Sequence, residues 1–443
     1  MDLPRNPELP PEVARRRRAA AFAALGSDVM VLPAAPLRFA SRDTDYAYRP
    51  DSELFYLTGA AEPGIVAVLV GGESPEWTLF VPPHDPHVAL WSGERLDPEA
   101  ATERFAPDAC HPSDELEERL PELLSRGRRI HYRLGTDERV ERLVRRSLDE
   151  HRTRGQRSGG GPRAVVDPGG ILDELRLRKD AHEIELIRAA VAVTLEGHRA
   201  GAGAARPGVG EWEVEAAVEG TFRGAGARGA AFGTIVGSGP NACVLHYRDN
   251  RHRIPENGLV LVDAGADVAL YAGDVTRTWP AGGRFTPEQR AVYDLVDAAR
   301  AAGVARVGPG VRISEVHDAS VAVLLDGLRD LGVLRGSRDE LLESGAYRAY
   351  YPHQTSHWLG LDVHDPGDYA CAGEPRRLEP GMVLTVEPGL YFRPGGEEAA
   401  ARFEGIGIRV EDDVLVTESG GENLSAALPT DAEAVEALVR AHR

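Results

Sequence analysis

Four acidic residues in the second half of the sequence stand beside apolar runs. Asp263 ends a Leu-Val-Leu-Val run, Glu387 ends a Val-Leu-Thr-Val run, and Asp274 and Glu411 adjoin further runs. Short apolar runs of this composition predict buried strands. A carboxylate that is buried without a positive partner is costly, and Lys179 is the sole lysine in the chain. The fold must therefore bring something cationic to these strand ends.

A histidine, His357, extends the acidic set into a pattern suited to metal ions. Taken singly, Asp263 and Asp274 are explained as turn residues, Glu387 as the end of a strand, and His357 as a core histidine. Taken together, four carboxylates and one imidazole form a hard, oxygen-rich donor set, which favours Mn²⁺, Co²⁺ or Fe²⁺ over a structural zinc. The number of donors indicates two divalent ions. The segment between Asp263 and Asp274 predicts a hairpin that places both acids on neighbouring strands.

Three further histidines accompany this set, namely His246, His353 and His364. Beside a metal pair, an imidazole can donate a hydrogen bond to a carbonyl or to a tetrahedral oxyanion. The alternative for each of them is a polar histidine at the surface. The sequence therefore marks them as candidate residues for binding a substrate.

A stretch rich in glycine and proline, from Gly155 to Gly170, is the predicted linker between two domains. Residues 1–174 alternate helical and strand patterns, which is typical of an α/β domain, and residues 175–443 form a second, α+β domain. In the second domain we expect strands at 258–263, 271–278, 383–387 and 407–417, and helices at 181–199, 209–223, 287–307, 313–331 and 431–441.

The second domain also shows a sign of internal duplication. Segments 256–263 and 379–387 are similar, and each is followed by a strand that bears another acid. A repeat of this kind predicts internal pseudo-two-fold symmetry.

Charge and composition exclude several classes of function. The chain has 51 Lys and Arg against 70 Asp and Glu, a net charge of −19, which argues against binding to nucleic acid or to an anionic membrane. No apolar run approaches the ~18 residues of a membrane span. Cys110, Cys243 and Cys371 are far apart and odd in number, which supports neither a disulfide framework nor a zinc ribbon. We therefore expect a cytoplasmic protein.

Several segments of the sequence resemble the pita-bread metallopeptidases, and within them the Xaa-Pro aminopeptidases (aminopeptidase P). The resemblance covers nearly the whole chain and includes 43–50 and 53–59 in the first domain. It implies a pita-bread catalytic domain with internal pseudo-two-fold symmetry behind the α/β domain. The segments that carry it in the second domain are Thr234–Tyr247, Val262–Gly265, Gly273–Pro280, Ser356–His364, Thr385–Tyr391 and Gly405–Glu411.

The resemblance implies hydrolysis of the bond that joins the first residue of a peptide to a proline in second position. Two divalent ions, with Mn²⁺ as the expected metal, would activate the attacking water, and Glu387 would also handle the proton of that water. The implied metal ligands are Asp263, Asp274, His357, Glu387 and Glu411.

The resemblance also assigns roles around the metal ligands. His246 and His364 would hold the substrate and the developing oxyanion, and His353 would line the pocket. Arg409 would contact the ligands, although a pairing of Arg409 with Asp412 or Asp413 is the alternative.

More distant residues are implied as well. Tyr391 would lie near the site, and Trp91 and Asp43 would reach toward the site of a neighbouring subunit, since the family is commonly tetrameric. We therefore expect a homotetramer or a homodimer. Gln354 departs from the glycine that relatives often carry after the histidine that corresponds to His353.

Two other functions are alternatives to an aminopeptidase. A prolidase, which cuts only Xaa-Pro dipeptides, would share every metal ligand. A non-catalytic pita-bread module would typically have lost the ligands, whereas all five are present here. The Leu-Trp-Ser-Gly-Glu-Arg segment around Trp91 resembles aminopeptidase P and favours an enzyme that acts on longer peptides.

Overall fold

The computed structural model describes residues 7–155 and 159–441, which form two compact units. The N-terminal unit spans Pro7–Leu175, and the C-terminal unit begins at Arg176. The predicted linker, residues 155–170, is not a linker along its whole length. It contains β8 (Ala164–Val166) and the start of α7 (Gly169–Leu177), and residues 156–158 lie outside the described residues. The reason is that β8 pairs with a strand of the N-terminal sheet and so belongs to that unit. The predicted boundary at residues 174 and 175 falls inside α7.

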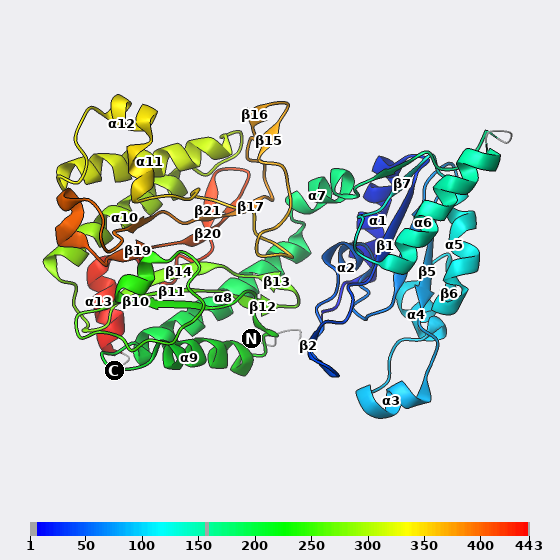
Figure 1. The fold of residues 1–443 in the computed structure, drawn as a ribbon, viewed down its shortest axis with the longest axis horizontal. Helices are drawn as coiled ribbons and strands as arrows, with labels where there is room; N and C mark the ends of the chain where they lie inside the picture. Colours follow the sequence, from blue (N-terminus) through cyan, green and yellow to red (C-terminus); the bar gives the residue numbers. More distant parts are fainter. Residues whose placement is uncertain (1–6, 156–158, 442–443) are drawn as a thin grey trace. The chain divides into compact units, whose positions relative to one another are not determined.

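The N-terminal unit is built on a six-stranded mixed sheet in the order β6-β5-β4-β1-β7-β8. Its central strands β1 and β4 are wholly buried and antiparallel, and β1 pairs with β7 in parallel. Helices lie on both sides of this sheet in Figure 1. The elements before β8 are α1 (Pro11–Leu25), β1 (Val29–Pro33), β2 (Phe39–Ser41), β3 (Thr44–Asp45), α2 (Ser52–Thr58), β4 (Val66–Val70), β5 (Glu76–Val81), α3 (Pro86–Ser92), α4 (Pro98–Phe105), β6 (Ala109–Pro112), α5 (Leu116–Ser125), β7 (Arg129–His131) and α6 (Glu138–Glu150).

The C-terminal unit combines long helices with short, mostly antiparallel strands. Its elements are α8 (Ala181–Ala204), α9 (Glu211–Gly224), β9 (Gly229–Ala230), β10 (Ile235–Ser238), β11 (Leu259–Ala264), β12 (Ala266–Val268), β13 (Tyr271–Ala272), β14 (Val275–Pro280), α10 (Pro287–Arg306), α11 (Ile313–Asp330), α12 (Arg338–Ser344), β15 (Ala370–Cys371), β16 (Glu374–Pro375), β17 (Val383–Val386), β18 (Gly389–Tyr391), β19 (Gly407–Arg409), β20 (Asp412–Val416), β21 (Gly421–Asn423) and α13 (Ala432–Ala441). In residues 7–155 and 159–441, no helix has both the length and the apolar character needed to cross a bilayer.

The C-terminal unit contains two matching halves, as the internal similarity predicted. In the first half β11 pairs antiparallel with β14, and α8 packs against α9 and these strands. In the second half β17 pairs antiparallel with β20, and α10 packs against α11 and these strands. Figure 1 shows α8 and α9 on one side of the strands and α10 and α11 on the other. Each half therefore presents one antiparallel strand pair toward the middle of the unit.

Two expected strands are each broken in the structure, and each break lies next to an acid. The expected strand 271–278 divides into β13 and β14, because β13 pairs with β12 whereas β14 pairs with β11. The expected strand 407–417 divides into β19, which pairs with β18, and β20, which pairs with β17. Asp274 and Glu411 occupy the breaks, where the chain changes partner strands.

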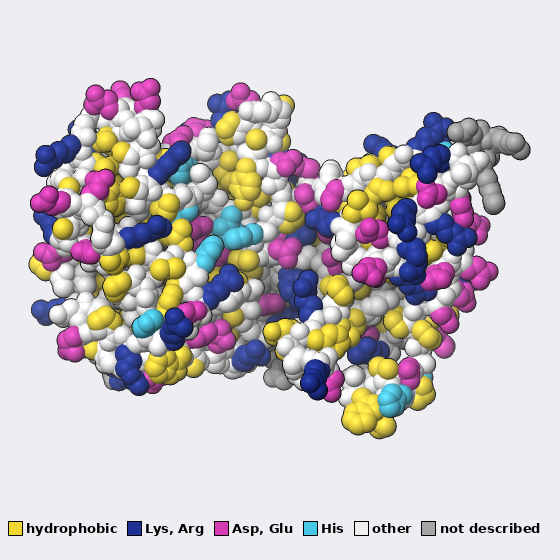
Figure 2. Space-filling view, in the orientation of Figure 1, with side chains coloured by type: hydrophobic (Ala, Val, Ile, Leu, Met, Phe, Trp, Pro, Cys, Tyr) yellow, Lys and Arg dark blue, Asp and Glu magenta, His cyan; other side chains and the backbone are white. Residues whose placement is uncertain are grey.

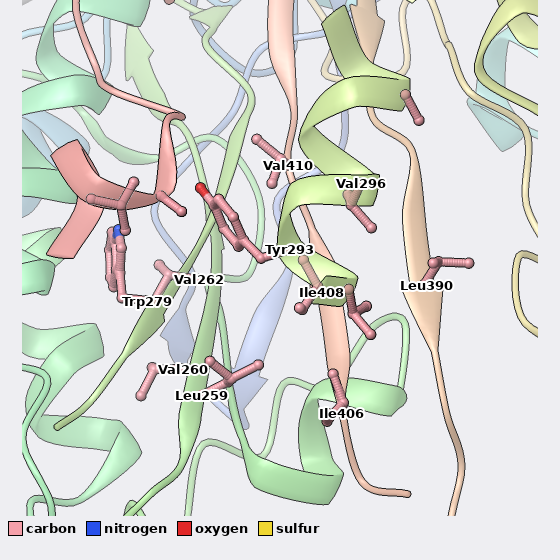
Figure 3. Packing of buried hydrophobic residues seen from close by; sticks show 14 of the residues in the cluster. Leu259, Val260, Val262, Trp279, Tyr293, Val296, Leu390, Ile406, Ile408 and Val410 are labelled. Carbon is pink, nitrogen blue, oxygen red and sulfur yellow. The ribbon is translucent and has the colours of Figure 1, made fainter. Parts of the chain in front are cut away.

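Side-chain alternation along β11 separates the core from the site. Val260, Val262 and Ala264 belong to the largest apolar cluster, whereas Leu261 lies in a separate cluster, and Asp263 lines a pocket. A strand directs alternate side chains to opposite faces. Figure 3 shows Val260, Val262 and Trp279 on one side of Tyr293, with Ile408 and Val410 close by. A one-residue slip of β11 would turn Asp263 into this apolar cluster.

Gly265, between β11 and β12, lies against the backbone just before Asp274. A Cβ added at Gly265 would lie 1.7 Å from the carbonyl oxygen of Gly273. Only glycine therefore permits the close approach of the two segments that carry Asp263 and Asp274.

We expect Gly265→Ala to lower the free energy of unfolding by at least ~1–3 kcal/mol, the usual cost of overpacking. Urea denaturation measures this change. The control is Gly220→Ala in α9, where an added Cβ meets no atom within 4 Å; alanine in a helix is expected to stabilise by about 0.5–1 kcal/mol. Equal stability of the Gly265→Ala variant and the unmodified protein would contradict the close approach.

Candidate metal centre and substrate pocket

A pocket of about 280 Å³ lies in the C-terminal unit and brings most of the predicted site residues together. Figure 2 shows histidine side chains gathered on the face of this unit that is turned to the viewer. The lining residues are Phe232, Ile235, Leu245, His246, Arg248, Asp263, Asp274, His353, Gln354, Ser356, His357, Val363, His364, Glu387, Arg409 and Glu411. All five predicted metal ligands and all three additional histidines are therefore in one pocket.

The deepest part of the pocket is a group of buried acids and one histidine. Asp274, His357 and Glu411 each offer a ligand atom, and these atoms lie within 4.8 Å of one another. Asp263 and Glu387 line the same space, and Glu387 Oε1 lies 3.7 Å from His357 Nε2. The two halves of the unit each contribute a strand pair to this group, which explains how residues so distant in sequence converge.

His357 is oriented by a backbone carbonyl. Its Nδ1 lies 2.9 Å from the carbonyl oxygen of Trp358, so Nδ1 must carry the hydrogen and donate it. In the neutral ring Nε2 is then an acceptor, and it lies 3.3 Å from Oδ2 of Asp274. Two acceptors that face each other at this distance need a cation or a proton between them. An imidazole held in this way through its second nitrogen is the usual arrangement of a metal ligand.

A chain of hydrogen bonds runs along the wall of the pocket from Asp263 to His353. Arg409 donates from Nη2 to Oδ2 of Asp263 at 2.6 Å and from Nη1 to the hydroxyl of Tyr391 at 2.9 Å. The Tyr391 hydroxyl then donates to Nε2 of His353 at 2.9 Å, and Nδ1 of His353 donates to the carbonyl oxygen of Gln354 at 2.8 Å. Arg409 thus pairs with Asp263 rather than with Asp412 or Asp413.

This hydrogen-bond chain fixes His353 as a neutral ring. Burial, together with the charge of Arg409, lowers the pKa of His353 to about 3. Burial likewise raises the pKa of Tyr391 to about 12, so its hydroxyl keeps the proton that it donates. The contact with Gln354 uses the backbone, so the glutamine in place of the family's glycine leaves it intact.

The acids of the pocket repel one another and resist ionisation. Burial, followed by the charges of Asp263, Asp413 and Glu387, raises the pKa of Asp274 well above its usual range. Burial and the charge of Asp274 do the same for Glu411, and burial raises the pKa of Glu387 to about 6. These carboxylates therefore lack enough positive charge around them.

The residues of this group fit divalent metal ions. Within the described ranges, Oδ1 of Asp263 is buried and makes no hydrogen bond. Glu411 accepts a hydrogen bond from Thr276 at 2.5 Å through Oε2, which orients the carboxylate. Three observations indicate cations between these residues. Oδ1 of Asp263 has no hydrogen-bond partner among the described residues, the pKa values of Asp274 and Glu411 are raised, and Nε2 of His357 faces a carboxylate oxygen. Carboxylate and imidazole donors suit hard or borderline divalent ions.

The remaining predicted residues fall into two groups. His246, Gln354 and His364 are exposed at the mouth of the pocket, and the ring of His364 lies 4.4 Å from that of His357 between centroids. Trp91, at the end of α3, and Asp43, between β2 and β3, are exposed residues of the N-terminal unit, and neither lines the pocket.

Sequence reasoning missed the residues that hold the predicted ligands and their backbone in place. Thr355 accepts the backbone N–H of Glu387 at 2.8 Å, and Asp413 accepts that of Asp274 at 2.9 Å. Arg277 pairs with Asp412 at 2.8 Å and donates to the backbone oxygen of Glu411. The consecutive acids after Glu411 were the available signal for this layer, since buried acids need partners.

Comparison with known proteins places the chain in a family. A family model described as metallopeptidase family M24 matches residues 185–418, which is more than half of the chain, and one described as aminopeptidase P, N-terminal domain, matches residues 14–131. The chain belongs to metallopeptidase family M24. Its predicted fold, an α/β domain followed by a pita-bread domain, is confirmed by the structures that resemble it.

This M24 protein resembles Xaa-Pro aminopeptidases along almost its whole length. It is 38% identical over 434 residues to the Xaa-Pro aminopeptidase of Escherichia coli, covering 98% of each chain. It is 34% identical to Xaa-Pro aminopeptidase 1 of Streptomyces coelicolor, covering 95% of this chain and 85% of that one.

Solved structures show the same likeness. The aminopeptidase PepP of Pseudomonas aeruginosa matches with a TM-score of 0.94 and 40% identity, covering 98% of this chain and 99% of that one. A zinc-substituted E. coli aminopeptidase P in complex with product matches with a TM-score of 0.93 and 38% identity over the same shares.

The raised acid pKa values predict that metal uptake by this M24 protein releases protons near pH 6. With its pKa at about 6, Glu387 in the metal-free site is partly protonated there, and a ligand must lose its proton to bind. We expect more protons released per Mn²⁺ bound at pH 6 than at pH 8, and apparent affinity that rises with pH. Titration in weak buffer with a pH indicator measures both.

The raised pKa of Glu387 also determines how the stability of the metal-free protein changes with pH. The pKa of Glu387 rises from 4.5, its ordinary value, to about 6 in the folded protein. The metal-free protein therefore loses stability as the pH rises through this range. Glu215→Gln is the control, since burial raises the pKa of Glu215 but this residue does not line the pocket. Proton release that is identical at pH 6 and pH 8 would contradict the prediction.

Proposed function

We propose that this protein is a metal-dependent Xaa-Pro aminopeptidase, which removes the first residue from peptides that carry proline second. The observation that carries the proposal is the convergence of four carboxylates and His357 on one pocket, in a chain that is 38% identical to an enzyme of that name over 98% of both lengths. Family membership supports peptide-bond hydrolysis.

The proposed ligands are Asp263, Asp274, His357, Glu387 and Glu411, which would hold two divalent ions. Bound there, such ions would supply Lewis acidity to water and to the scissile carbonyl. We propose Mn²⁺ as the native metal because oxygen donors dominate the set.

Glu387 is the proposed proton carrier of the reaction. Its carboxylate would accept a proton from the attacking water and give it to the leaving proline nitrogen. The support is its position beside the other proposed ligands, where its carboxylate lines the pocket. The backbone N–H of Glu387 donates to the carbonyl oxygen of Thr355, which holds the residue in place.

The other residues would bind and orient the peptide. The peptide would lie in the pocket with its later residues toward the mouth. There His246 and His364 would donate hydrogen bonds to the substrate carbonyl and to the oxyanion. His353 would form a rigid part of the wall, because both its nitrogens are already hydrogen-bonded.

An oligomer completes the proposal. Trp91 and its neighbour Leu90 are large apolar side chains with exposed fractions of 76% and 80%. We propose that Trp91 and Asp43 act at a subunit boundary of a homotetramer or homodimer. The three cysteines are free, which supports a reducing compartment, and we propose the cytoplasm.

Prolidase activity is the second candidate, and Arg248 is the observation that favours it. Arg248 is exposed at the pocket and, among the residues that the structure describes, forms no hydrogen bond or ion pair. A guanidinium in this position is suited to the free carboxylate of a short peptide. A dipeptidase needs such a group, whereas an aminopeptidase can also use one when the peptide is short.

We expect the Mn²⁺-loaded protein to cleave Xaa-Pro-Xaa tripeptides and to leave peptides with a bulky second residue intact. Chromatography of the released first residue measures the rate. Asp274→Ala is the inactive control and should abolish both cleavage and metal binding, because Asp274 belongs to the tightest group of ligand atoms. Rapid hydrolysis of Xaa-Pro dipeptides with no attack on tripeptides would replace the aminopeptidase with a prolidase.

We expect Arg248→Gln to raise KM for tripeptides with a free carboxylate about three- to tenfold, the range of a partly exposed charge pair. The same tripeptides with a C-terminal amide should show little change. Arg251→Gln is the matched control, since Arg251 pairs with Asp249 and does not line the pocket. An equal effect on acid and amide substrates would exclude carboxylate recognition by Arg248.

A further inference from the structure

The sole lysine of the chain is buried in a cluster of ions behind the pocket. The side chain of Lys179 is 0% exposed, and its Nζ lies 2.9 Å from Oδ2 of Asp365. Arg176 contacts Oδ1 of Asp365 and Oδ2 of Asp362, both at 2.6 Å. Two cations and two acids therefore balance in charge. Burial alone would raise the pKa of Asp365, but Arg176 and Lys179 lower it below its usual range, so Asp365 is ionised.

The cluster joins two distant parts of the C-terminal unit. Arg176 and Lys179 flank the end of α7 and the start of α8, whereas Asp362 and Asp365 lie in the loop between Trp358 and Gly367. The loop packs tightly on the cluster: a Cβ added at Gly360 would lie 2.7 Å from Oδ2 of Asp365 and 2.8 Å from Cε of Lys179.

The loop begins directly after His357 and contains His364. The backbone N–H of Asp365 donates to the carbonyl oxygen of Trp358 at 3.0 Å, and Nδ1 of His357 donates to the same oxygen at 2.9 Å. His364 directly precedes Asp365. One carbonyl therefore links the ionic cluster to the orientation of His357, and one peptide bond links it to His364.

The loop also reaches the strand that leads to another ligand. The backbone N–H of Ala272 donates to the carbonyl oxygen of Gly360 at 3.0 Å. Ala272 ends β13, two residues before Asp274. A displacement of the loop would thus be felt at His357, at His364 and at the approach to Asp274.

We propose that Lys179, Arg176 and Asp365 are positioning residues for this reaction, which hold the 358–367 loop so that His357 and His364 point into the pocket. This inference rests on the proposed function for its kinetic test but not for its metal-binding test. Acid residues in the pocket are left without full neutralisation, whereas Asp365, eight positions from His357, receives two cations at less than 3 Å. The only lysine of the chain thus binds the loop that follows His357 and contains His364.

The test compares Lys179→Met with the double variant Lys179→Met/Asp365→Asn. The single variant leaves one acid in excess, and the double variant restores the charge balance through Arg176 and Asp362. We expect the single variant to lower kcat about 10–100-fold with KM changed less than about threefold, and to weaken Co²⁺ binding about 10–100-fold, as for other groups that orient a ligand. The double variant should regain stability toward urea but not kcat, Co²⁺ affinity or the visible absorption spectrum of bound Co²⁺.

The control is Asp28→Asn in the N-terminal unit, which removes a buried carboxylate that pairs with Arg129 at 2.6 Å. It should lower stability while kcat and the Co²⁺ titration stay unchanged. The proposal is overturned if both lysine variants bind Co²⁺ and turn over like the unmodified protein, or if the double variant regains all three properties. When Lys179→Met does not fold, the double variant alone decides between these outcomes. Absence of peptidase activity in the unmodified protein would overturn the proposed function, while the Co²⁺ titration would still test the loop.

Discussion

Mutual repulsion between carboxylates that are removed from water governs the C-terminal unit. Two unit charges 4 Å apart repel by about 4 kcal/mol at the effective dielectric of a protein. In two of these acids, a hydrogen bond holds one carboxylate oxygen: Arg409 donates to Asp263, and Thr276 donates to Glu411. The oxygens that remain face a common centre. The raised pKa values of Asp274 and Glu411 follow from that arrangement.

Two buried acids outside the pocket, Asp412 and Asp365, are treated in the opposite way. Asp412 receives both Arg277 and Arg300 at 2.8 and 2.7 Å, and Asp365 receives Arg176 and Lys179. The pKa of Asp412 is lowered, since these arginines outweigh its burial. The fold therefore neutralises these two acids with side chains, whereas Asp413, whose Oδ2 accepts the backbone N–H of Asp274, shares the raised pKa of the pocket acids. Four acids with raised pKa values, Asp274, Glu387, Glu411 and the adjoining Asp413, therefore lie together in or next to the pocket.

Much of the fold and of the candidate site could be predicted from local sequence. Asp263 and Glu387 end apolar runs, and their strands β11 and β17 lie where the pattern of Val and Leu placed them. The breaks at Asp274 and Glu411 could not be predicted, because only a change of partner strand divides each segment into two strands. The division between linker and sheet failed for a similar reason: β8 is three residues long, and its partner β7 lies far back in the chain.

Residue roles that depend on long-range contacts were beyond local reasoning. Arg409 had two nearby acids as candidate partners, and it pairs with Asp263 because β18 and β19 carry it to the end of β11. Lys179 carried no signal except that it is unique, because Asp365 meets it only through the folding of the 358–367 loop. The sequence marks which groups need partners, whereas the topology chooses the partners.

The order in which the pocket residues leave the ribosome follows from the two-half design. The first strand pair supplies Asp263 and Asp274, but Glu387 and Glu411 come from the second pair, which is among the last segments of the unit to be synthesised. The growing chain therefore contains Asp263 and Asp274 before Glu387 and Glu411 have been synthesised. The pocket can therefore form only after the second strand pair has been synthesised and the two halves have packed together, with ion pairs such as Arg409 with Asp263 and Arg277 with Asp412 between them.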